Sequence, residues 1–153
     1  GLLHANFRQP ALDYADLIKL TLFMTRDMSQ VEKMFRLAVF NVLSHNRDDH
    51  GKNFSFLMDE TGMWALSPAY DLIYSAGPGG EQSTRAAGEG RSPGQAHLLE
   101  LAKTASLSAK KAKEIIDQCR AALNKWDALA EEADVSKDRI AEIGKQLKEN
   151  KAA

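Results

Sequence analysis

The chain has 153 residues, a length that predicts one domain with a single core. With 44% hydrophobic and 27% charged residues, its composition is that of a soluble globular protein and excludes a disordered chain. The formal net charge of −1 supplies no overall attraction for polyanions, so we predict no direct binding of nucleic acid and no association with anionic membranes.

The single cysteine, Cys119, excludes an internal disulfide framework and fits a reducing compartment. No apolar run reaches the ~18 residues that a membrane span requires, and the chain does not begin with a basic region followed by an apolar stretch. We therefore expect a cytoplasmic protein. The first residues, Gly-Leu-Leu-His, resemble a cut inside a larger protein more than a natural start.

Two helices are predicted at the start of the chain. Dense apolar residues favour a helix over 13–28, and a second helix over 29–45 carries apolar side chains around most of its circumference. Ser29 and Glu32 have the spacing of a capping box, in which the serine accepts from a free backbone N–H and the glutamate reaches back. We expect the second helix to lie at the centre of the core.

A polar octet, residues 46–53, follows the second helix and is predicted to be a loop because it lacks periodicity. Residues 54–58 and 63–66 have the composition of two short strands, joined in a hairpin by the turn signal at 59–62. We expect Trp64 to contribute to the core. Asp71 follows the second strand, so the hairpin folds it back towards the octet.

The second half of the chain is predicted to be a loop followed by helices. Residues 75–94 contain six glycines and few apolar side chains, which indicates a long flexible loop. Helices are predicted over 95–104 and 108–132, with Trp126 in the core, and Ser136 caps a last helix. The predicted fold class is mainly α (α+β), with a core over 13–75, a flexible loop over 75–94 and a helical tail over 95–150.

The octet reads Asn-Arg-Asp-Asp-His-Gly-Lys-Asn and holds five groups that can carry charge or bind metal. They lie between a buried helix and a strand, where grouped acids and bases repel one another or lose hydration unless they share a ligand or a network. Asp48 precedes Asn53 by five positions, and Asp71 adds a second carboxylate. Phosphoryl transfer requires such a set, because it needs a carboxylate that orients a hydroxyl and oxygen ligands for magnesium.

The spacing resembles the catalytic loop of protein kinases, in which four residues separate an aspartate from an asparagine. Arg47-Asp48 also reproduces the Arg-Asp pair of that loop, whereas Asp49 would leave three intervening residues. The wider stretches, Phe-Asn-Val-Leu-Ser-His-Asn-Arg-Asp-Asp-His-Gly-Lys-Asn-Phe-Ser-Phe over 40–56 and Trp-Ala-Leu-Ser-Pro-Ala-Tyr-Asp over 64–71, strongly resemble the C-terminal lobe of HipA-like toxin serine/threonine kinases. Two positions depart from ordinary kinases: Asn46 replaces a histidine, and Tyr-Asp-Leu over 70–72 replaces Asp-Phe-Gly.

This resemblance implies a helical, kinase-like lobe whose small hairpin carries the metal-binding aspartate. It implies that Asp48 is the catalytic aspartate and that Asn53 and Asp71 hold Mg²⁺ beneath the phosphates of ATP. His50 and Lys52 would then face the phosphates or the substrate hydroxyl. The resemblance further implies a toxin–antitoxin system with a DNA-binding antitoxin as partner, and a protein substrate such as an aminoacyl-tRNA synthetase.

The sequence contains no glycine-rich loop ahead of a strand and no strand with a phosphate-pairing lysine, so we predict that the ATP-clamping N-terminal lobe is absent from these residues. Because positioning dominates catalysis of phosphoryl transfer, we expect the chain to fold but to phosphorylate weakly or not at all.

Two other functions stay open from the residues themselves. A metal-dependent phosphohydrolase would use one or two metal ions held by Asp48, Asp49, His50 and Asp71. A non-catalytic interaction module is the other alternative.

Overall fold

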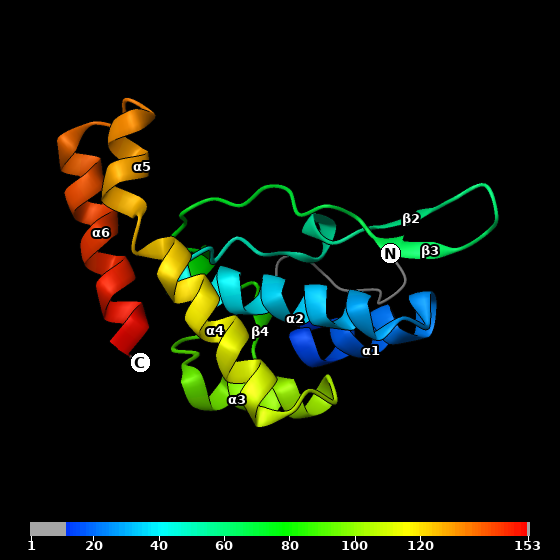
Figure 1. Cartoon of the computed structure of the whole chain (residues 1–153). Coiled ribbons are helices and arrows are strands. Elements are labelled where there is room, and N and C mark those ends of the chain that lie inside the picture. The colour runs from blue at the N-terminus through cyan, green and yellow to red at the C-terminus, as the bar shows by residue number, and fades with distance from the viewer. Residues whose placement is uncertain (1–11, 153) are drawn as a thin grey trace.

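The computed structural model describes residues 12–152, so the expectation about the first residues lies outside the described part of the chain. Four helices pack together, and two more form a pair at one side of them (Figure 1). The packed helices are α1 (Tyr14–Thr25), α2 (Met28–Leu43), α3 (Gln95–Thr104) and α4 (Ala109–Leu123). The pair at the side is α5 (Trp126–Glu132) and α6 (Lys137–Ala152).

Short strands form two small sheets. Strand β1 (Leu12–Asp13) pairs in parallel with β4 (Thr84–Arg85). Strand β2 (Phe56–Met58) pairs antiparallel with β3 (Trp64–Leu66), with Leu57 opposite Ala65. Single 3₁₀ turns lie at Gly51–Asn53 and Pro78–Gly80. The chain is mainly α with some β, as predicted.

Helix α2 lies at the centre of the core, as its apolar composition predicts. It contacts α1, α3, α4 and α6, and burial of its apolar surface is the main source of stability in a helical domain of this kind. Its fully buried side chains include Val31, Met34, Phe35, Ala38 and Val39. Among residues 12–152, no helix is both long and apolar enough to cross a membrane.

The caps of the first two helices show one correction to the sequence prediction. Asp13 caps α1 by accepting from the Ala15 N–H. Asp27, and not Ser29, caps α2: its Oδ1 accepts from the Ser29 N–H over 2.8 Å, and its Oδ2 accepts from the Ser29 hydroxyl. The predicted capping box at Ser29 and Glu32 is therefore wrong, because the Asp27 carboxylate, two residues before Ser29, already binds the free N–H group.

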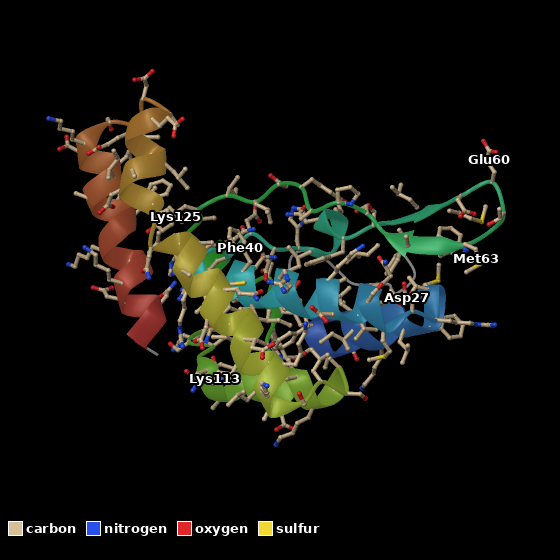
Figure 2. The ribbon with its side chains drawn as sticks, in the orientation of Figure 1. Asp27, Phe40, Glu60, Met63, Lys113 and Lys125 are labelled. Atoms are coloured by element: carbon tan, nitrogen blue, oxygen red, sulfur yellow. The ribbon has the colours of Figure 1, made fainter. Side chains whose placement is uncertain are left out.

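The β2–β3 hairpin extends away from the helices, with Glu60 at its tip (Figure 2). Its inner end is anchored by Leu66, which is buried and whose N–H donates to the Gln30 side chain over 3.2 Å. The prediction that Trp64 lies in the core is wrong: its side chain is 37% exposed. A two-stranded hairpin has no second layer to cover its outer face, so alternation alone overstates burial here.

The predicted helix over 108–132 is divided in two. Helix α4 ends at Leu123, and after Asn124 and Lys125 the chain continues as α5 in a new direction (Figure 1). The break lets Trp126 reach α6, where its indole Nε1 donates to the Ile140 carbonyl over 3.1 Å. Trp126 is half-buried, so it contributes to the α5–α6 contact and not to the central core.

Candidate active site

The octet leaves α2 alongside the segment that follows the hairpin. Asn46 and Ser75 form a parallel β-bridge. The Ser75 N–H donates to the His45 carbonyl over 3.0 Å, and the Arg47 N–H donates to the Ser75 carbonyl over 3.3 Å. The two segments are therefore joined through their backbones at the start of the octet.

Side chains extend this contact towards Asp71. The Asn46 Nδ2 donates to the Asp71 carbonyl over 3.4 Å, and the Tyr70 hydroxyl donates to the Lys52 carbonyl over 2.7 Å. Asp71 itself has a positive φ of 54°, a conformation that non-glycine residues adopt rarely and often at functional sites. Residues 70–75 thus touch the octet at both of its ends, as the return of the hairpin predicts.

The two adjacent aspartates of the octet have opposite environments. Asp49 is fully buried, and both of its carboxylate oxygens accept hydrogen bonds. Oδ2 accepts from the Tyr14 hydroxyl over 2.6 Å and from the Gln82 amide over 3.2 Å, and Oδ1 accepts from the Thr84 N–H over 3.0 Å. Asp48 is half-buried, and its carboxylate has no hydrogen-bond or ion-pair partner among residues 12–152. Only the Asp48 carboxylate is therefore available to a ligand.

Burial also sets the protonation behaviour of Asp49. Loss of hydration raises the pKa of its carboxyl group to about 6, against the opposing effect of the hydrogen bonds from Tyr14 and from the backbone of Thr84. Burial raises the pKa of the Tyr14 hydroxyl well above its ordinary value, and the neighbouring Asp49 charge raises it further. Tyr14 is therefore a neutral hydrogen-bond donor to Asp49 throughout the physiological range.

Asn53 ends the 3₁₀ turn Gly51–Asn53 and points its side chain back into the octet. Its Nδ2 donates to the Asp48 carbonyl over 3.0 Å, which orients the amide so that Oδ1 is the atom left to bind a cation. Asp71 is exposed, and its carboxylate has no partner in the described part of the chain. The site therefore offers three oxygen groups, from Asp48, Asn53 and Asp71.

His50 and Lys52, the other predicted site residues, differ in exposure. His50 is half-buried at the start of the 3₁₀ turn, and its Nδ1 is buried without a hydrogen-bond partner among residues 12–152. Lys52 is exposed, and its carbonyl holds Tyr70. Because this Nδ1 is closed off from solvent, a ligand would reach His50 only through the exposed part of its ring.

The glycine-rich segment over 75–94, predicted as a flexible loop, packs against the octet along its middle part. The Arg47 guanidinium donates to the carbonyls of Gly80 and Arg91, and the Arg47 carbonyl accepts from the N–H and the hydroxyl of Ser83. Gly77 approaches Arg47 so closely that a Cβ there would lie 2.5 Å from the Arg47 Cβ. Gly77 thus allows close backbone packing beside the octet.

Four residues of this site were missed by sequence reasoning: Tyr14, Asn41, Gln82 and Thr84. All are buried, and Asn41 donates through Nδ2 to the Tyr14 hydroxyl over 2.9 Å. Asn41 carried a detectable signal, because an amide on the apolar helix α2 requires a buried partner. Gln82 and Thr84 lie in a glycine-rich segment without periodicity and gave no such signal.

Comparisons with known proteins add the following findings. The HipA-like C-terminal domain family matches residues 1–126. The chain is 44% identical over 48 residues to a protein named as a kinase, Y4mE of Sinorhizobium fredii, and 48% identical over 42 residues to the serine/threonine-protein kinase toxin HipA of Shewanella oneidensis. These stretches cover 31% and 28% of the chain but only 11% and 10% of the relatives.

A solved structure has the same fold. A chain from the S. oneidensis toxin–antitoxin complex of HipA, HipB and operator DNA superposes with a TM-score of 0.69 at 20% sequence identity. The superposition covers 89% of this chain and 34% of the solved chain. The likeness therefore concerns the fold of about one third of that protein.

Proposed function

Because the chain belongs to the HipA-like C-terminal domain family, we propose that it forms the catalytic lobe of a serine/threonine kinase of the toxin type. In this proposal the Asp48 carboxylate orients a substrate hydroxyl and accepts its proton. Asn53 and Asp71 provide oxygen ligands for Mg²⁺, and His50 and Lys52 contact the phosphates or the hydroxyl. When bound, magnesium and ATP supply the transferable γ-phosphoryl group and neutralise its charge.

The observation that carries the proposal is the difference in environment between Asp48 and Asp49, the two adjacent aspartates of the octet. Asp49 is buried and all of its acceptor oxygens are engaged, whereas the Asp48 carboxylate beside it is unpaired within the described residues. The backbone bridge of Asn46 with Ser75 brings the Asp71 segment against the same loop. Two available carboxylates on two joined segments are what positioning of a hydroxyl and a cation requires.

The residues present fit magnesium better than a transition metal. Among residues 12–152, no group of three His, Cys, Asp or Glu side chains is placed to hold a metal ion. Mg²⁺ does not need such a cage, since it binds through one or two protein oxygens together with nucleotide phosphates and water. The Asn53 Oδ1 and the Asp71 carboxylate are oxygen donors of that kind.

The metal-dependent phosphohydrolase is the weaker alternative. It requires Asp49 as a ligand beside Asp48, but Asp49 accepts from Tyr14, Gln82 and the Thr84 backbone. Releasing it would leave those three buried donors without an acceptor, at a cost of about 1–3 kcal/mol each. A non-catalytic module does not account for two available carboxylates on two segments that are joined through their backbones.

The activity and partners of the whole protein belong to the same proposal. The solved relative is a complex with HipB and operator DNA, which supports an antitoxin as partner of this chain. A protein hydroxyl is the proposed acceptor, with an aminoacyl-tRNA synthetase as one candidate substrate, and the cytoplasm is the proposed location. A nucleotide-binding lobe completes the site in this proposal, so the chain alone binds magnesium–ATP weakly and transfers phosphate poorly.

The first experiment measures binding of magnesium–ATP to the chain by calorimetry. Asn53→Ala and Asp71→Asn should each weaken binding, because each removes a cation ligand. Asp16→Asn, on an exposed face of α1, is the matched control and should bind like the unchanged chain. Tight binding of a transition metal without nucleotide would favour the phosphohydrolase instead.

The second experiment measures phosphotransfer in a protein that joins this chain to a nucleotide-binding lobe. Asp48→Asn should reduce the rate by about 10²–10⁴-fold, the usual contribution of a positioned general base, and Asp71→Asn should raise the magnesium requirement. The Asp16→Asn control should retain the rate. Full activity of both the Asp48 and the Asp71 variants would refute the assignment.

A further inference from the structure

A continuous series of hydrogen bonds runs beneath the octet and ends at Asp71. The Tyr14 hydroxyl donates to the Asp49 Oδ2 over 2.6 Å, and the same hydroxyl oxygen accepts from the Asn41 Nδ2 over 2.9 Å. The Asn41 Oδ1 in turn accepts from the Asn46 Nδ2 over 3.1 Å. The Asn46 Nδ2 also donates to the Asp71 carbonyl over 3.4 Å. We name these four side chains, with the Asp71 carbonyl, the hydrogen-bond chain.

Every side chain of this series is buried. Tyr14 and Asn41 come from α1 and α2, and Asn46 and Asp49 come from the octet; none of the four is more than 2% exposed. Hydrogen bonds at such depth are stronger than in water, and a buried polar network whose bonds are made restricts its members to one arrangement. The Tyr14 ring is held further by an edge-on contact with Phe54, next to Asn53, with ring centroids 5.8 Å apart.

The bonds all point in one direction. The ionised Asp49 can only accept, so the Tyr14 O–H must point towards it and the Tyr14 oxygen must accept from Asn41. The Asn41 amide then has its NH₂ group towards Tyr14 and its Oδ1 towards Asn46. Asn46 must consequently present its NH₂ group, which is the donor that reaches the Asp71 carbonyl.

An unsatisfied atom agrees with this direction. The Asn46 Oδ1 is buried and has no hydrogen-bond partner among residues 12–152. Exchanging the Asn46 Oδ1 and Nδ2 by rotating the amide would not help. It would place the amide oxygen against two acceptors, the Asn41 Oδ1 and the Asp71 carbonyl. The orientation of Asn46 is therefore imposed by its neighbours although it leaves one acceptor unpaired.

We propose that the hydrogen-bond chain fixes the position of Asp71 relative to Asp48, with Tyr14, Asn41 and Asn46 as positioning residues. Asp49 links the chain to the octet one residue after Asp48, and Asn46 links it to the backbone of Asp71. The roles of Asp48 and Asp71 rest on the proposed function, whereas the coupling between their two segments is a property of the fold.

The test is native-state hydrogen exchange of the 153-residue chain, without nucleotide or magnesium. Tyr14→Phe keeps the ring and removes the hydroxyl, which deletes the link between Asn41 and Asp49. The readout is the Ser75 amide, which donates to the His45 carbonyl four residues after Asp71. Its exchange should become about three- to tenfold faster, the effect of losing roughly one hydrogen bond, while amides of α3 stay unchanged.

The matched control is Thr21→Val. Thr21 lies on the same helix α1, is as fully buried as Tyr14, and donates its hydroxyl to the Leu17 carbonyl over 2.7 Å, outside the hydrogen-bond chain. Its replacement should leave exchange at Ser75 unchanged. If Tyr14→Phe accelerates Ser75 no more than Thr21→Val does, the coupling is refuted.

A second pair of variants tests the direction of the bonds and does not depend on the folding of Tyr14→Phe. Asn46→Ala removes the donor, whereas Asn46→Asp places carboxylate oxygens against the Asn41 Oδ1 and the Asp71 carbonyl. Asn46→Asp should therefore accelerate exchange at Ser75 more than Asn46→Ala, and the reverse order would overturn the direction. Because exchange requires no ligand, failure of this test leaves the magnesium–ATP and phosphotransfer results standing, and their failure leaves this one standing.

Discussion

The helical core and the octet assembly, formed by residues 46–53 with 70–94, have interiors that are built by different means. The core of α1 to α4 is filled by apolar side chains such as Phe35, Leu98 and Ile115. Beneath the octet assembly, amides, the Tyr14 hydroxyl and the Asp49 carboxylate are buried and hydrogen-bond to one another. Apolar contacts are non-directional and tolerate many arrangements, whereas buried hydrogen bonds specify one. The core therefore gives stability, and the octet assembly gives position to the candidate catalytic groups.

The largest expected loss of stability comes from removing a large apolar side chain from the core. Phe35→Ala should lower the free energy of unfolding by about 3–5 kcal/mol, because it removes apolar contacts and leaves a cavity in α2. Phe23→Ala is the control, since that side chain is 78% exposed and its loss should cost less than about 0.5 kcal/mol. Urea unfolding measures both, and equal costs would contradict the assignment of the core.

Crowding the octet assembly should have the next largest effect. A Cβ at Gly77 would overlap the Glu81 carbonyl and the Arg47 side chain, and its φ of 72° disfavours any L-residue. Gly77→Ala should cost roughly 2–5 kcal/mol, from the left-handed backbone and from overpacking together.

Gly79 offers a matched control for this variant. It has a similar φ of 65°, but nothing lies within 4 Å of an added Cβ. Gly79→Ala should therefore show only the backbone part of the cost, about 1–2 kcal/mol. The glycine-rich segment would not be packed against Arg47 if the two alanine variants were equally stable in urea.

The smallest expected effect is a pH dependence of the free energy of unfolding that arises from the buried Asp49 carboxylate. The folded pKa of Asp49, about 6, lies above its unfolded value of about 3.9, so the folded state binds a proton that the unfolded state releases. Stability from this group is present below pH ~4 and is lost as pH rises to ~6. The free energy of unfolding of the unchanged chain, relative to that of Asp49→Asn, should therefore fall by roughly 2–3 kcal/mol between pH 4 and pH 7.

Asp27 provides a control of opposite sign. Hydrogen bonds from the hydroxyl and the N–H of Ser29 lower its pKa in the folded state, so its contribution is present above the unfolded pKa and is lost as pH falls. The stability advantage of the unchanged chain over Asp27→Asn should grow as pH rises to ~4 and then stay level, whereas its advantage over Asp49→Asn shrinks between pH ~4 and ~6. Urea unfolding at several pH values measures both, and parallel curves for the two variants would contradict the burial of Asp49.

Most of the fold could be predicted from the sequence because helices have local signals, namely the spacing of their apolar residues and the residues at their ends. The predicted bounds of α3 agree with the structure, and the hairpin lies where its turn signal places it. The break after Leu123 was missed since the apolar stripe continues through Trp126, and neither Asn124 nor Lys125 is a strong helix breaker. What separates α4 from α5 is the contact of Trp126 with α6, which is tertiary.

Only part of the candidate site could be predicted from the sequence. The Asp-to-Asn spacing favoured Asp48 over Asp49 and related Asp48 to Asn53; the roles of these residues stay a prediction. The reason why Asp49 is unavailable lies in Tyr14 and Thr84, each 35 residues away along the chain in opposite directions. No local pattern contains such a pairing, so the network beneath the octet appears only once the chain is folded.

The two ends of the hairpin imply different tolerance to length variation. At the tip, Asp59 closes the turn by accepting from the N–H groups of Thr61 and Met63, and Glu60 points away from the rest of the molecule (Figure 2). Asp71 and Ser75, by contrast, are both tied to Asn46: the Asp71 carbonyl accepts from the Asn46 side chain, and Ser75 pairs with the Asn46 backbone. An epitope or a fluorophore can therefore be inserted at Glu60, whereas one residue added between Asp71 and Ser75 would shift the Asp71 carboxylate out of register with the octet.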